Sequence, residues 1–212
     1  RESKMAVEDR SHRDKELNPR RHPHGAADYD NSSKSAPWLA IRKNALLGIP
    51  EQKLMNDIPR LVGPGNFANL GHALGGSAVL LGVGILEQGH TDSKIYSVDI
   101  NFDGMKKKNA FMDLFGVRGL IKPCKGSTVE FAEELKDLEF VFAFIDADHT
   151  YNSVVRDFEA WSPLIKKGGL VAFHDTHQEF SHQAVTASVV GRQGWKERKD
   201  LHVQTIRVFE KE

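Results

Sequence analysis

After Gly63-Pro64-Gly65, short apolar segments alternate with segments whose apolar residues recur at helical spacing. This rhythm limits the fold more than any other feature, because strands and helices that alternate at this length form a doubly wound, mainly parallel sheet covered by helices on both faces. The run from Phe140 to Ile145 is apolar at every position, as in a strand buried on both sides. We predict an α/β fold with strands at 67–70, 94–100, 119–123, 140–145 and 170–173, and helices at 78–86, 105–115, 129–135 and 184–190.

Three local signals refine this prediction. Ser77 stands where it could cap the helix that begins at residue 78. An amphipathic helix, interrupted by Pro163, is indicated by a buried stripe of Val154, Phe158, Trp161 and Ile165. The segments 195–198 and 203–209 predict a closing antiparallel hairpin.

The amino-terminal part of the chain has a different character. Residues 1 to about 36 are polar and lack an apolar period, which predicts disorder or an arm that orders on contact. Apolar residues return at helical spacing over 37–62, and the break at Gly48-Ile49-Pro50 separates two short helices. We therefore expect an arm and helical cap over residues 1–62 and a main domain over residues 63–212.

Composition narrows the function classes. Lys plus Arg and Asp plus Glu balance at 29 each, so no overall field attracts nucleic acid or an anionic membrane. The single cysteine, Cys124, excludes an intrachain disulfide and a zinc–thiolate cluster. No apolar run approaches the ~20 residues of a membrane span, and the first residues lack the apolar core of a secretory signal. We expect a soluble cytoplasmic protein, and a homodimer is compatible with this composition.

Unusual residues stand at the predicted strand ends, where ligands bind in parallel sheets. A glycine-rich loop begins at Gly71, Asp99 closes the next strand, and Asp146 and His174-Asp175 follow two later strands. Glycines before a helix let a ligand approach the backbone, and Asp99 could accept hydrogen bonds from ribose hydroxyls. The alternatives are a glycine turn and an Asp that caps the next helix. The loop spacing differs from G-x-G-x-x-G, which disfavours NAD or FAD.

Two later segments carry a specific resemblance. The sequence Ile145-Asp146-x-Asp148-His149-x-Tyr151 is followed, after a helix with Trp161, by Gly168-Gly169 and then His174-Asp175. This pattern resembles the Rossmann-like class I S-adenosylmethionine-dependent methyltransferases. The similar branch includes macrolide-sugar O-methyltransferases, cephalosporin-hydroxylase-like proteins and bacterial small-molecule O-methyltransferases. The resemblance covers about residues 66–178.

The resemblance implies a set of cofactor contacts. It places Asp99 on the ribose, and it gives Asp146 a place beside the cofactor as well as the metal. Many relatives have an acidic residue at the position of Asn69, which could still accept a hydrogen bond from the cofactor's ammonium group. The remaining contacts that it implies are Gly71, Gly75, Gly76 and Ser77 around the methionine part, and Gly126 and Ser127 near adenine.

The resemblance also implies Mg²⁺ or another divalent cation held by Asp146, His174 and Asp175, with His177 as a spare ligand. A histidine in place of a carboxylate weakens the case for Mg²⁺, which prefers oxygen. His149 is the candidate general base, and its alternative role is that of a capping or core histidine. A cation should lower the pKa of His149, and Asp148 should raise it.

These residues predict methyl transfer to a hydroxyl of a small polar acceptor, such as a sugar. The segment around residues 20–45 should order over the acceptor pocket. The alternatives are a non-catalytic S-adenosylmethionine-binding protein and an NAD-linked oxidoreductase. A tRNA or rRNA methyltransferase is disfavoured by the neutral charge.

Overall fold

The computed structural model describes the backbone of residues 36–212 and the side chains from residue 39 onward. The predicted arm over residues 1 to about 36 lies outside the described residues. The elements are α1 (Ala36–Ala45), α2 (Ile49–Val62), β1 (Asn66–Leu70), α3 (Gly76–Glu87), β2 (Lys94–Asp99), α4 (Met105–Leu114), β3 (Ile121–Lys125), α5 (Thr128–Glu134), β4 (Phe140–Ile145), α6 (Tyr151–Trp161), β5 (Ile165–Phe173), α7 (Glu179–Ser188), β6 (Trp195–Glu197) and β7 (Arg207–Lys211), with short 3-10 turns at Arg118–Leu120, Ser162–Leu164 and Lys199–Leu201.

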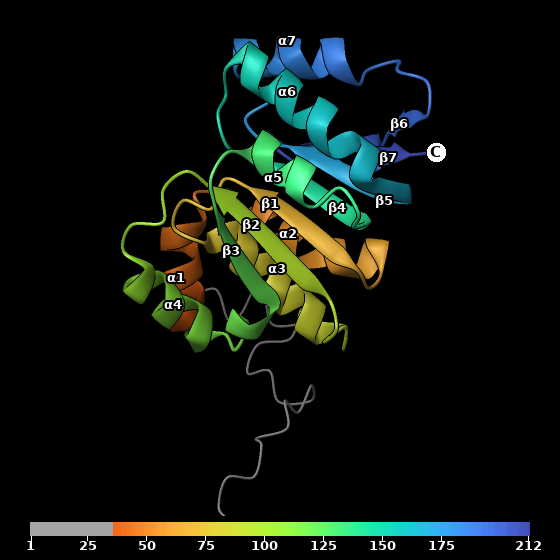
Figure 1. Ribbon diagram of the computed structural model, residues 1–212. Coiled ribbons are helices and arrows are strands. Elements are labelled where there is room, and N and C mark those ends of the chain that lie inside the picture. Colours follow the sequence, from red (N-terminus) through yellow and green to blue (C-terminus); the bar gives the residue numbers. More distant parts are fainter. Residues whose placement is uncertain (1–35) are drawn as a thin grey trace, which may run out of the picture.

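A seven-stranded sheet in the order β3-β2-β1-β4-β5-β7-β6 forms the centre of the molecule (Figure 1). Strands β1 to β5 are parallel, and β7 is antiparallel to both β5 and β6. The predicted α/β fold, a Rossmann-like sheet that ends in an antiparallel pair, is confirmed. The order reverses between β1 and β4, so this is the point where the helices change faces and where such folds bind ligands.

Helices cover both faces of the sheet. One apolar cluster joins residues of α1, α2, α3 and α4 to one face, and a second joins residues of α5, α6 and α7 to the other. Helix α3 is apolar all round because it lies between the sheet and the two amino-terminal helices. A Cβ at Gly76 would lie 2.1 Å from the Cα of Ala45, and one at Gly84 would lie 2.1 Å from the Asn56 carbonyl oxygen. These two glycines therefore permit α1 and α2 to pack on α3.

Several local predictions need correction. Helix α3 is preceded by Gly75 in the left-handed conformation at φ 88°, so Ser77 is not its N-cap. The predicted interruption at Pro163 is confirmed: the amphipathic helix ends at Trp161, and Pro163 lies in a separate 3-10 turn, because proline cannot donate the backbone hydrogen bond that would continue the helix. Ile165 begins β5 instead of ending that helix, and the third strand lies at 121–125 instead of 119–123.

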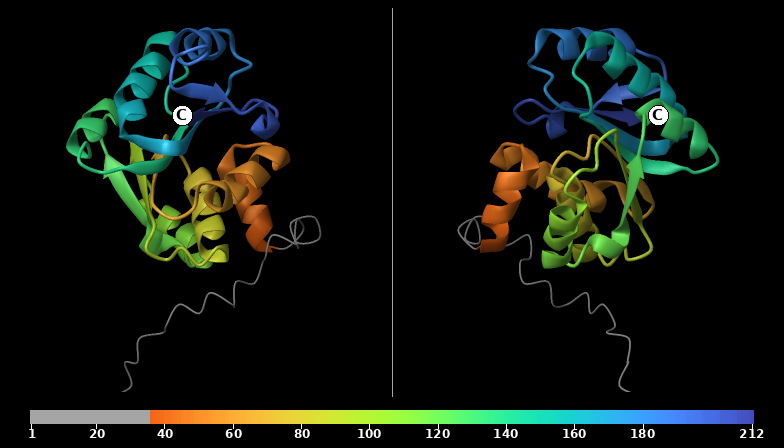
Figure 2. Two further views of the ribbon diagram at one scale, coloured as in Figure 1. Left: turned by 90° about the vertical axis from the view of Figure 1, so that its right-hand side faces the viewer. Right: turned by 60° about the vertical axis from the view of Figure 1, so that its left-hand side comes forward.

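The two predicted amino-terminal helices are confirmed as α1 and α2. Ile41 is fully buried in the core, and the start of α2 lies beside the segment that leads into β7 (Figure 2). This contact joins residues 154 positions apart in sequence, because Thr205 donates its backbone N–H to Glu51. The domain boundary at 62/63 stays a prediction. Within residues 36–212, no helix is long and apolar enough to cross a membrane.

Candidate active site

Register places the polar strand ends side by side. Leu70 of β1 pairs with Ile145 of β4, which in turn pairs with Phe173 of β5. The next residues are Gly71, Asp146 and His174, and the ladder continues through them: Asp146 N donates to Leu70 O at 3.0 Å and His174 N to Ile145 O at 3.1 Å. The residues that directly follow β1, β4 and β5 therefore lie at the same edge of the sheet.

The glycine-rich loop is fastened to Asp99. One carboxylate oxygen of Asp99 accepts from the backbone N–H groups of His72 and Ala73, both at 2.9 Å, and the other accepts from Asn101 N at 2.9 Å. Ala73 adopts a φ of 42°, a conformation that is unfavourable for a residue with a Cβ. At Gly71, with φ 96°, a Cβ would lie 2.2 Å from the Asp146 carbonyl oxygen, so only glycine fits there.

Asn69 lies under this loop with no exposed surface. Its amide donates to Gly71 O at 3.0 Å and to Ser97 Oγ at 2.9 Å, bonds that a carboxylate could not donate. The placement gives the Asn69 amide nitrogen a role in holding the loop. Its Oδ1 has no hydrogen-bond partner among the described residues, and the predicted contact of this residue with the cofactor's ammonium group stays a prediction. Beside it, His72 is buried with Nδ1 2.8 Å from Ser97 Oγ, and burial lowers its pKa to about 4.

A cavity of about 520 Å³ opens at the ends of β1, β2 and β3. Four predicted cofactor residues line it, namely Gly71, Asp99, Gly126 and Ser127. The remaining lining residues are Ile100, Thr128, Val129, Glu130, Ala147, Asp148, Ser153, Arg156 and Asp157. The four sequence-predicted residues thus mark one wall of a real cavity, which is large enough for a nucleoside-sized ligand.

Other predicted cofactor residues lie elsewhere. Gly75, Gly76 and Ser77 are not among the lining residues, and the lack of a side chain at Gly76 is explained by its contact with α1. The carboxylate of Asp146 belongs to a neighbouring group of side chains. Contacts of these four residues with a cofactor stay predictions.

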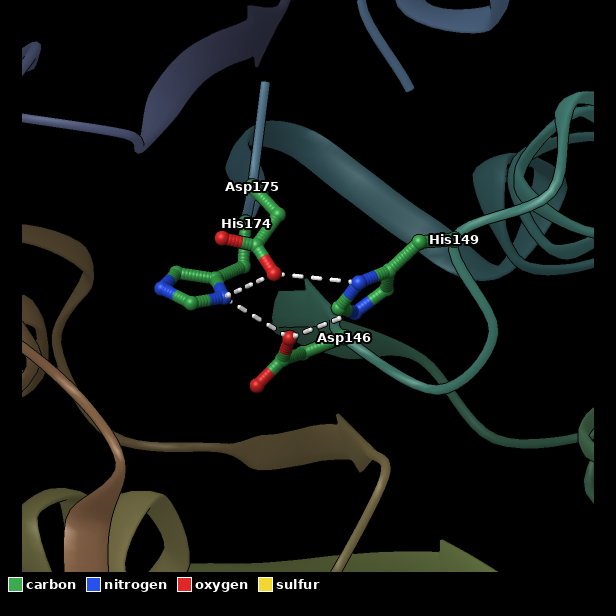
Figure 3. Close-up of side chains that lie close together, drawn as sticks. All are labelled: Asp146, His149, His174 and Asp175. Atoms are coloured by element: carbon green, nitrogen blue, oxygen red, sulfur yellow. Dashed lines mark hydrogen bonds and ion pairs between the residues drawn. The ribbon is translucent and has the colours of Figure 1, made fainter. Parts of the chain in front are cut away.

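Beside the cavity, Asp146, His149, His174 and Asp175 come together (Figure 3). We call these four residues the Asp/His cluster. His174 Nδ1 lies 2.9 Å from Asp146 Oδ1, and His149 Nε2 lies 3.3 Å from the same oxygen. His149 Nδ1 lies 3.0 Å from Asp175 Oδ2. Each residue offers one ligand atom, and all four atoms lie within 4.8 Å of one another. This donor set therefore fits a divalent cation.

An unusual backbone conformation orients the carboxylate of Asp175. Asp175 has a φ of 52°, in the left-handed region that residues with a Cβ rarely adopt. Such conformations gather at functional sites, where surrounding contacts hold them. The spare ligand His177 is peripheral, with a side chain 60% exposed and Nδ1 3.7 Å from Asp175 Oδ1.

Charges inside the Asp/His cluster stabilise one another. Burial alone would lower the pKa of His174, but its contacts with Asp146 and Glu51 outweigh burial and raise that pKa to about 10. The hydrogen bond with Asp146 raises the pKa of His149. Burial would raise the pKa of Asp146, yet the two imidazoles lower it below its ordinary range. The imidazoles and carboxylates of the cluster therefore favour one another's charged forms.

Asp148 interacts with the charge of His149, as predicted, and it has two further roles. Its carboxylate accepts from Thr150 N at 3.2 Å and from Ser153 Oγ at 2.6 Å at the start of α6. Asp146 and Asp175 are the carboxylates that contribute most to the raised pKa of His149. Asp148 also fixes the turn that leads into α6 and lines the cavity.

Glu51 also contacts the Asp/His cluster, although no feature of the sequence predicts this. This residue is 3% exposed, and its Oε2 lies 3.6 Å from His174 Nε2. Its carboxylate also accepts from Gly48 N at 2.7 Å and from Thr205 Oγ1 at 2.6 Å. The only local signal is the spacing Gly48-x-x-Glu51, which is typical of a helix start and indicates nothing about a site.

The fold and the two adjoining sites define the class I methyltransferase architecture. Residues 68–176, half of the chain, match the sequence profile of a methyltransferase-domain family. The chain belongs to this family, which confirms the family predicted from the sequence. Comparison with curated protein sequences gives no significant match.

Solved structures share the fold at low sequence identity. The O-methyltransferase TomG from Streptomyces achromogenes, in complex with SAM, has a TM-score of 0.68 at 14% identity, covering 88% of this chain and 96% of that chain. An O-methyltransferase from Bacillus cereus, in complex with SAH, has a TM-score of 0.67 at 13% identity, covering 88% and 98%. The O-methyltransferase NovP has a TM-score of 0.62 at 12% identity, covering 79% and 82%.

Proposed function

We propose that this methyltransferase uses S-adenosylmethionine to methylate a hydroxyl of a small polar acceptor, with sugars and other polyhydroxylated molecules as the favoured class. One observation carries the proposal: Asp146 and Ala147, consecutive residues after β4, belong respectively to the Asp/His cluster and to the lining of the cavity. A cofactor site and a site for activating a hydroxyl are thus adjacent. The complexes of TomG with SAM and of the Bacillus cereus enzyme with SAH support the choice of cofactor.

The cavity's residues suit a nucleoside. Asp99 would accept hydrogen bonds from ribose hydroxyls, since three backbone N–H groups already orient its carboxylate. Gly126 and Ser127 would lie near adenine. Ile100 is 77% exposed and lines the same cavity, so its apolar surface is available to the base.

The sulfonium of the cofactor supplies an already activated methyl group. The acceptor oxygen forms a bond to the methyl carbon as the carbon–sulfur bond breaks, and the hydroxyl proton passes to His149. The side chain of His149 is 34% exposed, so an acceptor can reach it. As a general base, His149 must first be unprotonated, while the nearby carboxylates favour its protonated form.

Asp146, His174 and Asp175 would hold the predicted cation, Mg²⁺ or another divalent ion. When bound, such a cation would lower the pKa of the acceptor hydroxyl and offset the charge of the carboxylates. Asp146 and Asp175 would then favour protonated His149 less strongly. The cation would therefore make the proton of the acceptor hydroxyl easier to remove, and His149 would accept that proton.

The rival functions make different predictions. A non-catalytic binding protein would bind the cofactor without turnover, and an NAD-linked oxidoreductase would bind NADH instead. The homodimer, the cytoplasmic location and the lack of a nucleic-acid partner also stay predictions.

Calorimetry with S-adenosylhomocysteine and with NADH, followed by a turnover screen of hydroxylated acceptors, tests the proposal. We expect S-adenosylhomocysteine to bind, NADH not to bind, and S-adenosylmethionine to be consumed with a polyhydroxylated acceptor. Binding without turnover on any acceptor would favour the non-catalytic alternative. Binding of NADH alone would contradict the proposal.

A further inference from the structure

We propose that the Asp/His cluster prefers a first-row transition-metal ion to Mg²⁺, and that Glu51 is the positioning residue that makes His174 a nitrogen ligand. This inference rests on the proposed function, because it concerns the cation that would assist the same reaction. It goes beyond that function in naming the class of the ion and a residue outside the methyltransferase-domain match at 68–176.

The donor atoms carry the first part of the argument. The four ligand atoms within 4.8 Å of one another are two imidazole nitrogens and two carboxylate oxygens. Mg²⁺ favours oxygen ligands in near-octahedral geometry, whereas imidazole favours transition metals such as iron, nickel and zinc. The nitrogen of His174, joined by that of His149 when His149 also ligates, therefore shifts the preference of the site away from Mg²⁺.

Glu51 carries the second part. The carboxylate is buried, and it is held from two sides, by Gly48 at the start of its own helix and by Thr205 before β7. Its Oε2 lies 3.6 Å from Nε2 of His174, on the side away from Asp146. At this ion-pair distance the carboxylate favours a proton on the outer nitrogen of the histidine, which leaves the other nitrogen available to a metal. In His174 that inner nitrogen is Nδ1, which lies 2.9 Å from Asp146 Oδ1.

His149 differs from His174 in its surroundings. Both of its nitrogens face carboxylates of the cluster, Nε2 toward Asp146 and Nδ1 toward Asp175. Its side chain is 34% exposed, compared with 9% for His174. We therefore assign the fixed ligand role to His174, while His149 can ligate or exchange a proton with the acceptor.

Direct metal binding to the full-length, metal-stripped protein tests the proposal. Calorimetric titrations with Co²⁺ and, separately, with Mg²⁺ should show Co²⁺ binding at least about tenfold more tightly, and bound Co²⁺ should give a visible absorption band with nitrogen ligands. His174→Asp replaces the nitrogen by oxygen and should narrow the difference between the two ions. Equal affinity for the two ions, or no binding of either, would overturn the proposal.

Glu51→Gln tests the positioning role, since the amide is nearly isosteric. We expect Co²⁺ affinity to fall by about 10- to 100-fold, the usual effect of losing a partner that orients a metal ligand. The matched control is Glu87→Gln, because Glu87 also bonds α2, through Asn56 Nδ2 at 2.9 Å, but away from the cluster. Equal losses in the two variants, or no loss in either, would contradict the role of Glu51.

Two further measurements separate the possible failures. Thermal unfolding and S-adenosylhomocysteine binding show whether each variant is folded; if Glu51→Gln does not fold, the wild-type and His174→Asp titrations decide the proposal. Full methyl transfer in the chelated protein would contradict a role of the metal in the reaction and would leave the proposed function intact. If the wild-type protein does not bind S-adenosylhomocysteine, the proposed function is refuted instead.

Discussion

The cavity and the Asp/His cluster shift the pKa of a buried carboxyl group in opposite directions, as Asp157 and Asp146 show. Asp157 lines the cavity, and burial raises its pKa to about 6 because the hydrogen bond from Thr128 offsets burial only in part. Asp146, in the Asp/His cluster, has a lowered pKa because two imidazoles outweigh its burial. Burial therefore favours the neutral form of Asp157 in the cavity, whereas the pairing with imidazoles favours the charged form of Asp146 in the cluster.

Replacing His149 should have the largest effect and should act on the cluster alone. We expect His149→Ala to lower kcat by about 10²- to 10⁴-fold, the usual contribution of a general base. Affinity for S-adenosylhomocysteine should hardly change, because His149 does not line the cavity. Steady-state kinetics and calorimetry measure the two quantities.

The pH dependence sharpens this prediction. The wild-type rate should rise with pH as His149 loses its proton. Because Asp146 raises the pKa of His149 and a bound cation lowers it, this limb should move to lower pH when the cation binds. The variant should lose this limb. His177→Ala serves as the control, since its side chain is 60% exposed at the edge of the cluster. Retention of more than about a tenth of kcat by His149→Ala would assign this residue to structure.

Asp99 tests the cavity in the same way. Asp99→Ala should weaken S-adenosylhomocysteine binding by about 1.5–3 kcal/mol, as expected for the loss of charge-assisted hydrogen bonds. Asp99→Asn keeps an acceptor for the loop amides of His72 and Ala73, so it should lose less. Calorimetry compares the three proteins, and unchanged affinity in the alanine variant would remove Asp99 from the cofactor site.

Chelation should separate the two regions without any substitution. Exhaustive removal of divalent ions should lower turnover by about tenfold or more, since the cation activates the acceptor hydroxyl. It should leave S-adenosylhomocysteine affinity unchanged, because the cavity does not include Asp146, His174 or Asp175. Turnover should return when divalent ions are added back. Full turnover after chelation would leave the three residues with a role in charge balance only.

The smallest effect concerns stability and Asp157. Its folded pKa of about 6 exceeds the unfolded value near 3.9, so its favourable contribution is complete below about pH 4 and is lost as pH rises through 6. Relative to wild type, Asp157→Asn should thus gain on the order of 2 kcal/mol between pH 4 and pH 7. Urea unfolding at both pH values measures this, with exposed Asp92→Asn as the control. An equal pH response in wild type and Asp157→Asn would contradict the raised pKa.

The difference between the two regions also explains what could be predicted. Strands and helices follow from local apolar periodicity, and strand ends share one edge of any parallel sheet, so Asp99, Asp146, His149 and Asp175 could be assigned to that edge from the sequence. Where a local pattern has two explanations, the sequence could not choose between them. Gly76 permits the close packing of α1, and Asn69 holds the loop from below, while the contacts of both residues with a cofactor stay predictions.

The sequence alone therefore determined the α/β fold, the methyltransferase family and most of the side chains at the sheet edge, because each depends on residues close together in the chain. Only the tertiary structure decided that Glu51 joins His174 and Thr205, a contact that spans 154 residues. Its physical basis is the packing of α2 against α3. This packing brings the buried carboxylate of Glu51 to the sheet edge that carries His174. The local apolar periodicity of the sequence does not predict contacts between residues so far apart in the chain.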